Sequence, residues 1–360
     1  FSSLRVPRSL ARGNILMPIS WTVTGIWGAM LVACYFVTSY VEKHAAMRGS
    51  HRKPLSPLVD KSLRAFFLAV LVSPLAMLWP WYVIPATLLY LPSFIDGTER
   101  RGRPSNWVRG WSLWWGVKRY FRLSIALDAQ ASKLNPKQQY IIGLHPHGFL
   151  PFGTMINLAT VVSDIDKLFL NGVQLRTLAA SFCFYIPAYR DLILGGGVVD
   201  AARYNARRVL DAGLSLSLVP GGATEGLYAM PGNHTLVLRK RRGFVKLALE
   251  TGAHLVPAFS FGETNCYNQM SANWPWIKTV QRKWQAVTGL SLPLVTNIIP
   301  NRATIMTVFG KAIPVTRKAV PTDAEIDALL ATYIAALTDL FHRNAPTYIA
   351  DPKMRGLTII

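Results

Sequence analysis

An uncharged apolar run near the start of the chain limits most strongly what this sequence can fold into. Residues 15–41 contain no charged side chain across 27 positions. At ~1.5 Å of rise per residue, a helix of this length exceeds the ~30 Å of bilayer hydrocarbon. Pro18, Gly25 and Gly28 are compatible with a membrane helix. The run therefore predicts a membrane span, with a cleaved targeting segment as the alternative.

A second uncharged region, residues 65–95, is interrupted by prolines, which argue against one straight helix. Basic residues flank it on both sides, and such flanks stay on the cytoplasmic face of a membrane. The pattern predicts a membrane hairpin that turns at Pro80, within a membrane-embedded region of residues 1–103. A core hairpin of a soluble protein is the alternative. The prolines are Pro74, Pro80, Pro85 and Pro92; the flanking cations are Arg52, Lys53, Lys61, Arg64, Arg100, Arg101, Arg103 and Arg109.

The composition favours lipid contact and a polyanionic partner. Charged residues make up only 16% of the chain, and 39 Lys and Arg against 18 Asp and Glu give a net charge of +21. Such an excess suits nucleic acid, an anionic membrane or a phosphorylated substrate. The later half lacks the basic and aromatic interleaving of a nucleic-acid-binding module, so no nucleic acid partner is expected. Three scattered cysteines without CxxC spacing predict no disulfide framework and a reducing, cytosol-facing environment.

A tryptophan-rich segment follows the second apolar region. Within residues 106–121, Trp107, Trp111 and Trp114 have the spacing of one helical face, and basic residues lie nearby. Tryptophan beside arginine suits the headgroup layer of a membrane, so the segment predicts an interfacial helix. The alternative is an aromatic stripe that packs on the domain core.

From residue 140 onward, strand and helix patterns alternate, which predicts an α/β domain within residues 104–360. Expected strands are 140–144, 175–182, 214–219, 254–260 and 303–309, and expected helices are 200–212, 243–251 and 323–342. The last helix is the best signalled, since Thr322 followed by Glu325 forms a capping box ahead of a helical apolar pattern.

Two histidines that flank a proline end the first of these strands, in the sequence "HPHG". Neutral imidazole is suited to removing a proton near pH 7, so His145 and His147 are candidate catalytic residues. Pro146 and Gly148 provide a constrained turn for them. The alternative is a pair of structural histidines. No other histidine has a recognisable metal-ligand spacing, so no metal site is expected.

Two further stretches are candidates for ligand contact. In "PGGATEG", the amides of Gly221 and Gly222 after a strand are placed to meet an oxyanion or phosphate, and the nearby Glu225 to hydrogen-bond a histidine. An ordinary turn is the alternative. A basic run then precedes the helix expected at 243–251, which predicts a phosphate-binding segment or a solvated basic face. Its residues are Arg239, Lys240, Arg241 and Arg242, with Lys246 in the helix.

Taken in order, "HPHG", "PGG", "RRGFVKLAL", "LVPAFSFGE" and "YNQM" resemble the diacylglycerol acyltransferase type 2 family, from about Asn106 to the closing helix. The resemblance implies a membrane enzyme of the endoplasmic reticulum whose catalytic domain faces the cytosol, with lipid droplets as a further location. It implies acyl transfer from acyl-CoA, as co-substrate and without a cofactor, to diacylglycerol, giving triacylglycerol. Monoacylglycerol and fatty alcohols are alternative acceptors, and non-catalytic lipid binding is a different class. The implied fold is a glycerolipid-acyltransferase-like mixed sheet flanked by helices, preceded by membrane segments.

By position, the resemblance makes His147 the base, His145 its neighbour and Glu225 the carboxylate of the site. The amides of Gly148, Gly221 and Gly222 would stabilise the oxyanion, and the basic run with Lys246 would hold the phosphates of CoA. Two departures stand out. Arg122 replaces the proline of the family's "YFP" element, and the Asp of the wider HxxxxD acyltransferases is absent, since Leu150 and Phe152 occupy those offsets.

Overall fold

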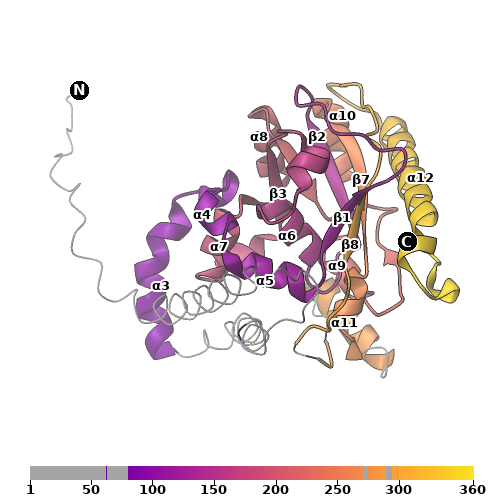
Figure 1. Ribbon diagram of the computed structural model, residues 1–360. Helices are drawn as coiled ribbons and strands as arrows, with labels where there is room; N and C mark the ends of the chain where they lie inside the picture. The colour runs from indigo at the N-terminus through magenta and orange to yellow at the C-terminus, as the bar shows by residue number, and fades with distance from the viewer. Residues whose placement is uncertain (1–61, 63–79, 271–274, 289–293, 298) are drawn as a thin grey trace, which may run out of the picture.

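The computed structural model describes residues 62, 80–270, 275–288, 294–297 and 299–360 (Figure 1). The predicted span at 15–41 and the first arm of the predicted hairpin therefore lie outside the described residues. The prediction of a domain boundary at residue 103 stays a prediction.

The described residues form a mixed α/β domain around a seven-stranded sheet, in the order β1-β8-β7-β2-β5-β3-β4. Neighbouring strands run parallel except β7 and β8, which are antiparallel. This confirms the predicted mixed sheet. The strands are β1 Ser124–Leu127, β2 Tyr140–His145, β3 Leu175–Ala179, β4 Val198–Asp200, β5 Ser215–Leu218, β7 His254–Phe261 and β8 Met306–Phe309; β6 Thr235–Leu236 and β9 Thr358–Ile359 form a separate parallel pair.

Helices cover both faces of the sheet, and alternate residues of β2 face opposite layers. Ile141 packs in a cluster with α8, α10 and α12, whereas Ile142 and Leu144 pack with α6 and the helical turn at Asp166–Leu170. Figure 1 shows α12, in yellow, along one side of the sheet and α6 on the other. The helices are α4 Asn106–Arg109, α5 Ser112–Tyr120, α6 Phe152–Ala159, α7 Tyr189–Gly195, α8 Arg203–Asp211, α9 Gly222–Gly226, α10 Gly243–Thr251, α11 Pro275–Thr288 and α12 Asp323–Tyr348. Short turns of helix lie at Thr98–Arg100, Ser181–Tyr185, Glu263–Cys266 and Pro352–Met354.

The predicted elements are present, with shifted ends. Helix α10 has the predicted bounds, and the strand expected at 175–182 ends at Ala179, where the chain turns into a short helix. Helix α12 extends beyond residue 342 to Tyr348. Its capping box is formed as predicted: the amide of Glu325 donates to Thr322 Oγ1 at 3.3 Å, and the amide of Thr322 donates to Glu325 Oε2 at 2.9 Å.

The prediction of a single interfacial helix at 106–121 is wrong. The chain forms two helices, α4 and α5, separated at Gly110 and Trp111, so the three tryptophans do not share one helical face. Trp111 and Trp114 are only 8% and 6% exposed and belong to a core cluster, whereas Trp107 is 67% exposed. The alternative, an aromatic stripe on the domain core, therefore holds for Trp111 and Trp114.

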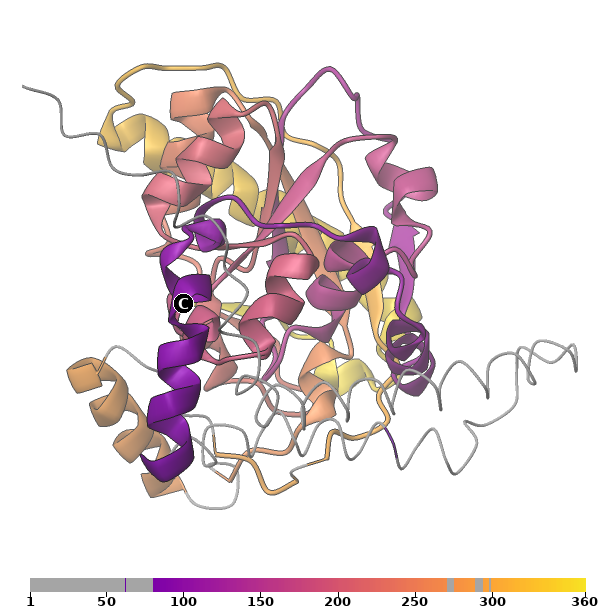
Figure 2. The same cartoon turned by 90° about the vertical axis from the view of Figure 1, so that its left-hand side faces the viewer.

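The second arm of the predicted hairpin is the helix α3, Pro80–Ile95. It begins at Pro80, and the first position of a helix tolerates proline. It also contains Pro85 and Pro92. The expectation that prolines prevent a continuous helix is therefore wrong for this arm. Figure 2 shows α3, in indigo, on the side of the molecule that faces the viewer. Across the described ranges, no helix is both long enough and apolar enough to span a bilayer.

An ion-pair group centred on the buried Arg190 joins the end of α3 to the sheet domain. Arg190, on α7, is 1% exposed and pairs with Asp96 at 3.2 Å and Glu99 at 2.9 Å. Its guanidinium also donates to the carbonyl of Ser93 at 2.6 Å. These contacts fix the segment after α3 against the sheet domain.

Candidate active site

His145, the last residue of β2, is fully buried in the layer that faces α12. Its Nε2 lies 3.1 Å from Tyr333 Oη, and that hydroxyl donates to the carbonyl of Gly143 at 3.2 Å. Because the hydroxyl has one hydrogen and gives it to the carbonyl, Nε2 of His145 must be the donor to Tyr333. Burial lowers the pKa of His145 to about 3. His145 is thus a neutral, structural histidine.

His147 lies two residues further on, past a cis His145–Pro146 peptide bond, and is partly buried. Its Nδ1 lies 3.1 Å from the carbonyl oxygen of Gly148, which can only accept, so Nδ1 carries the hydrogen. The lone pair is therefore on Nε2. Burial lowers the pKa of His147, against the opposing effect of the Gly148 carbonyl, so the ring is neutral at pH 7. A neutral imidazole with a fixed tautomer is what a general base requires.

Glu225, on the short helix α9, binds the histidine loop through its backbone. Its Oε1 accepts from the amide of His147 at 2.7 Å, and its Oε2 accepts from the amide of Val237 at 2.9 Å. The prediction that Glu225 hydrogen-bonds an imidazole is therefore wrong: the carboxylate sets where the His147 backbone lies. Burial raises the pKa of Glu225 to about 7, against the two amides and the charge of Arg241.

The "PGG" turn is shaped by Glu225 and closed on itself. A side chain at Gly221 would overlap the Glu225 carboxylate, so this position requires glycine. The amide of Gly222 donates to the carbonyl of Val219 at 3.0 Å, and Gly222 has a φ of 58°. The expected role of the Gly222 amide as an oxyanion donor is therefore wrong, because that hydrogen closes the turn. The oxyanion-donor role expected for the amides of Gly148 and Gly221 stays a prediction.

A second buried carboxylate, Glu263, holds the other end of the histidine loop, and sequence reasoning missed it. Its two oxygens accept from the amides of Phe152 at 2.7 Å and Gly153 at 2.9 Å, at the start of α6. Gly148 has a φ of 64°, and a Cβ there would lie 3.0 Å from the Glu263 side chain. Burial raises the pKa of Glu263 to about 8. The available signal was an acid directly after a buried apolar strand, in "FSFGE".

The basic run is engaged in structural contacts over half of its length. Arg241 donates to the carbonyl of Gly221 at 3.1 Å and to Thr224 Oγ1 at 3.0 Å, so it supports the "PGG" turn. Arg242 pairs with Asp323 at 2.9 Å and Asp327 at 2.8 Å on α12. Arg241 and Arg242 thus have contacts within the chain, and the phosphate-binding role expected for them stays a prediction.

For the rest of the basic group, phosphate binding stays a prediction. Arg239 and Lys240 are exposed, although Arg239 Nε also donates to the carbonyl of Ile359 at 2.9 Å. Lys246 lies partly buried on α10.

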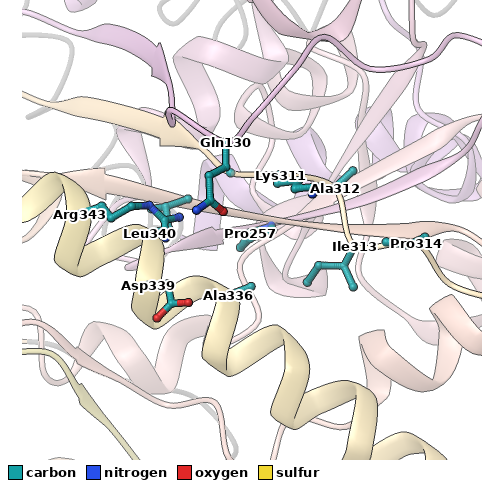
Figure 3. Close-up of a pocket in the computed structure, with 11 residues that line it drawn as sticks. Gln130, Pro257, Lys311, Ala312, Ile313, Pro314, Ala336, Asp339, Leu340 and Arg343 are labelled. Atoms are coloured by element: carbon teal, nitrogen blue, oxygen red, sulfur yellow. The ribbon is translucent and has the colours of Figure 1, made fainter.

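A cavity of about 230 Å³ lies between α12 and the segment after β8 (Figure 3). Lys311, Asp339 and Arg343 contribute its charged side chains, and Pro257 and Leu340 contribute apolar surface. Neither histidine of the "HPHG" turn lines it, nor does any residue of the "PGG" turn. This cavity is therefore separate from the histidine loop.

Comparisons with known proteins place these features in one family. A family model described as diacylglycerol acyltransferase matches residues 75–355. A 2-acylglycerol O-acyltransferase 1 from Bos taurus is 36% identical over 281 residues, covering 74% of this chain and 83% of the relative. A diacylglycerol O-acyltransferase 2 from Dictyostelium discoideum is 34% identical, covering 78% and 87%. A solved structure of the 1-acyl-sn-glycerophosphate acyltransferase PlsC from Thermotoga maritima overlaps with a TM-score of 0.38 at 10% identity, covering 74% of this chain and 95% of that chain.

Proposed function

Because the chain belongs to the diacylglycerol acyltransferase family, we propose that it transfers a fatty acyl group from acyl-CoA to diacylglycerol, giving triacylglycerol. The observation that carries the proposal is the hydrogen bond between His147 Nδ1 and the Gly148 carbonyl, which leaves Nε2 able to accept a proton. Relatives are named for both 2-acylglycerol and diacylglycerol, so monoacylglycerol is the alternative acceptor. The mixed sheet is then a catalytic domain of the glycerolipid-acyltransferase type.

In the proposed reaction, His147 Nε2 takes the proton of the acceptor hydroxyl while the hydroxyl oxygen attacks the thioester carbonyl. The new C–O bond forms, the tetrahedral intermediate collapses, and the C–S bond to coenzyme A breaks. The imidazolium then returns its proton to the leaving thiolate. Because burial lowers the pKa of His147, the protonated ring releases its proton readily in this second step.

Direct transfer is favoured over a covalent acyl-enzyme by the state of the described cysteines. A thiol acts as a nucleophile when its pKa is lowered. Burial instead raises the pKa of Cys183 to about 11 and raises that of Cys266 well above its ordinary value. Neither thiol has the electropositive surroundings of an activated nucleophile.

The proposal includes attachment to the endoplasmic reticulum membrane, with the catalytic domain on the cytosolic side. The uncharged sequence at 15–41 supports it, as do Leu88, Leu91 and Ile95, which α3 exposes at 63%, 45% and 76%. A neutral lipid acceptor dissolved in the bilayer would reach the enzyme from that side.

The test is acyl transfer by the full chain in proteoliposomes, with labelled acyl-CoA and product separation by thin-layer chromatography. Diacylglycerol, monoacylglycerol and a fatty alcohol are offered in parallel. We expect triacylglycerol from the wild type and a loss of turnover of about 10²–10⁴-fold in His147→Ala, the usual contribution of a general base. His342→Ala, which removes an exposed histidine on α12, is the matched control and should retain full turnover.

Near-normal turnover by a folded His147→Ala protein would remove His147 from the chemistry. Lipid binding by the wild type without release of coenzyme A, for any of the three acceptors, would instead point to a non-catalytic lipid-binding protein.

A further inference from the structure

Two arginines outside the histidine site have no acidic partner among the residues that the structure describes. Arg109 ends α4 and Arg176 lies on β3, and both side chains are partly buried. Over the described ranges, no carboxylate forms an ion pair with either. The deeply buried Arg190 and the half-exposed Arg343, in contrast, do have carboxylate partners.

The hydrogen bonds of the two guanidinium groups leave donors unused. The Nε of Arg109 is buried and has no hydrogen-bond partner. In Arg176, Nε donates to the carbonyl of Arg101 at 3.4 Å and Nη1 donates to the carbonyl of Leu175 at 3.0 Å. These two contacts orient the Arg176 guanidinium but place no negative charge beside it.

The two positive charges also act on each other. The pKa of Arg176 is lowered first by burial and then by the charge of Arg109, which places the two groups within electrostatic reach. Burying a cation without a counterion is unfavourable, and a second cation beside it increases the cost. An anion between the two guanidinium groups would relieve both effects.

The segment that Arg176 contacts through the carbonyl of Arg101 is itself held by backbone hydrogen bonds. The amides of Arg103 and Ser105 donate to the carbonyls of Leu194 and Gly195 at 3.0 and 2.8 Å, which fixes this segment over the α7 end. Gly197, with a φ of 85°, approaches the Arg176 side chain, and a Cβ there would lie 3.8 Å from its Cδ. Helix α4 contacts α7, and α7 contacts β4, the strand that pairs with β3.

We propose that Arg109 and Arg176 bind a phosphate group. Arginine presents paired donors that match phosphate oxygens, and a partly desolvated pair binds such an anion more strongly than exposed lysines do. The phosphate belongs either to the nucleotide end of acyl-CoA, in which case the assignment rests on the proposed function, or to a phospholipid headgroup. Arg241 and Arg242 already have partners within the chain, so this pair adds two cations to the exposed Arg239 and Lys240 of the basic run.

The position of the pair suits the nucleotide end of acyl-CoA. Arg176 pairs in register with Leu216, and Leu216 pairs with Ile141, four residues before His145. At ~3.3 Å per residue, this level of the sheet lies about 13 Å from the histidine end of β2, measured along the strands. Coenzyme A carries its phosphates at the far end of an extended chain from the thioester, so phosphate and acyl group are expected at separate places.

The experiment compares wild type with Arg109→Gln, Arg176→Gln and the control Arg208→Gln, which removes an exposed arginine from α8. The full chain is assayed in maltoside micelles, which contain no phosphate, and in phospholipid vesicles. Equilibrium binding of coenzyme A is measured in the same micelles, independently of turnover.

If the pair holds the donor, each Gln variant raises KM for acyl-CoA and weakens coenzyme A binding about tenfold in micelles, the factor that follows from ~1.4 kcal/mol. In that case kcat changes less than twofold and the control behaves like the wild type. If the pair holds a headgroup, coenzyme A binding in micelles is unchanged and the variants lose activity only in phospholipid vesicles. Wild-type behaviour of both variants in both settings overturns the proposal.

Two readouts keep this outcome separate from that of the proposed function. If the wild type transfers no acyl group but its coenzyme A binding falls in the variants, the phosphate site stands and the proposed reaction fails. Should a Gln variant not fold, Arg109→Lys and Arg176→Lys retain the charge but lose the paired donors. They should raise KM for acyl-CoA by about threefold if the pair holds the donor, and an unchanged KM together with unchanged vesicle activity would overturn the site.

Discussion

A histidine acts as a base only through the nitrogen that carries no hydrogen, and at His147 the Gly148 carbonyl decides which one that is. The same side chain two residues earlier is excluded from this role, because His145 is fully buried and donates to Tyr333. The two histidines of "HPHG" look equivalent in the sequence. The end of β2 separates them, since His145 is the last residue of the strand and is buried, whereas His147 lies in the turn that follows.

At the residue scale, Glu263 provides a prediction about pH and stability. Its pKa is raised from an ordinary value of 4.5 to about 8, so between these values the folded chain keeps a proton that the unfolded chain has released. The contribution of Glu263 to stability should therefore be fully present below pH 4.5 and be lost as the pH rises from there through 8. Glu225, with a pKa raised to about 7, acts in the same direction.

The measurement is thermal unfolding of the full chain between pH 5 and pH 9, for wild type and Glu263→Gln. The amide cannot ionise, so the stability of the wild type relative to the variant should fall as the pH rises from 5 to 8, while Glu225 and the histidines act on both proteins alike. The variant is expected to be less stable overall, because an amide NH₂ must face one of the two backbone amides that the carboxylate accepts. A decline as steep as in the wild type would show that Glu263 is not the titrating group.

At the element scale, the joint between α3 and the sheet domain depends on Arg190. Replacement by methionine keeps the bulk but removes the partner of Glu99, whose side chain is 18% exposed, and of Asp96, whose side chain is 35% exposed. We expect Arg190→Met to destabilise the protein by about 2–3 kcal/mol, because hydrogen bonds to a charged group contribute about 1.5–3 kcal/mol. Thermal unfolding gives the loss, and limited proteolysis should show earlier cleavage in residues 96–105.

A surface ion pair provides the comparison for Arg190. Arg203 pairs with Glu250 at 2.7 Å, but its side chain is 57% exposed, so Arg203→Met should cost about 0–1 kcal/mol. Equal effects of the two substitutions would mean that burial does not strengthen the Arg190 joint.

Elements that depend on local sequence were predictable, and those that depend on distant contacts were not. Helix α12 was predicted through its capping box, which needs only four residues. The break between α4 and α5 was missed, since a tryptophan stripe at helical spacing also fits two short helices that pack their rings into the core. Strand β1 was missed because it is four residues long, at the sheet edge, and contains no fully buried residue.

The same limit explains the outcome at the site. His147 was selected as a candidate from its motif. Glu263 is 110 residues away from the Gly153 amide that it accepts from, and no local pattern indicates such a contact. In the sequence, Arg242 belongs to a basic run without nearby acids. In the fold, it lies beside Asp323, 81 residues later in the chain. Charge patterns in a sequence therefore indicate how many cations there are, while the fold decides which of them are available.

At the scale of the whole molecule, the net charge of +21 predicts how the two substrates respond to salt. Acyl-CoA is a polyanion, so a positive field raises its rate of encounter, and ions in solution screen that field over ~10 Å at 0.1 M. Diacylglycerol is uncharged and arrives through the lipid phase. We therefore expect kcat/KM for acyl-CoA to fall about tenfold between low and high ionic strength, while kcat/KM for diacylglycerol changes less than twofold. Both are measured by varying one substrate at saturation of the other, in neutral micelles. An equal salt dependence for the two substrates would contradict electrostatic guidance of the donor and would indicate a general effect of salt on the enzyme.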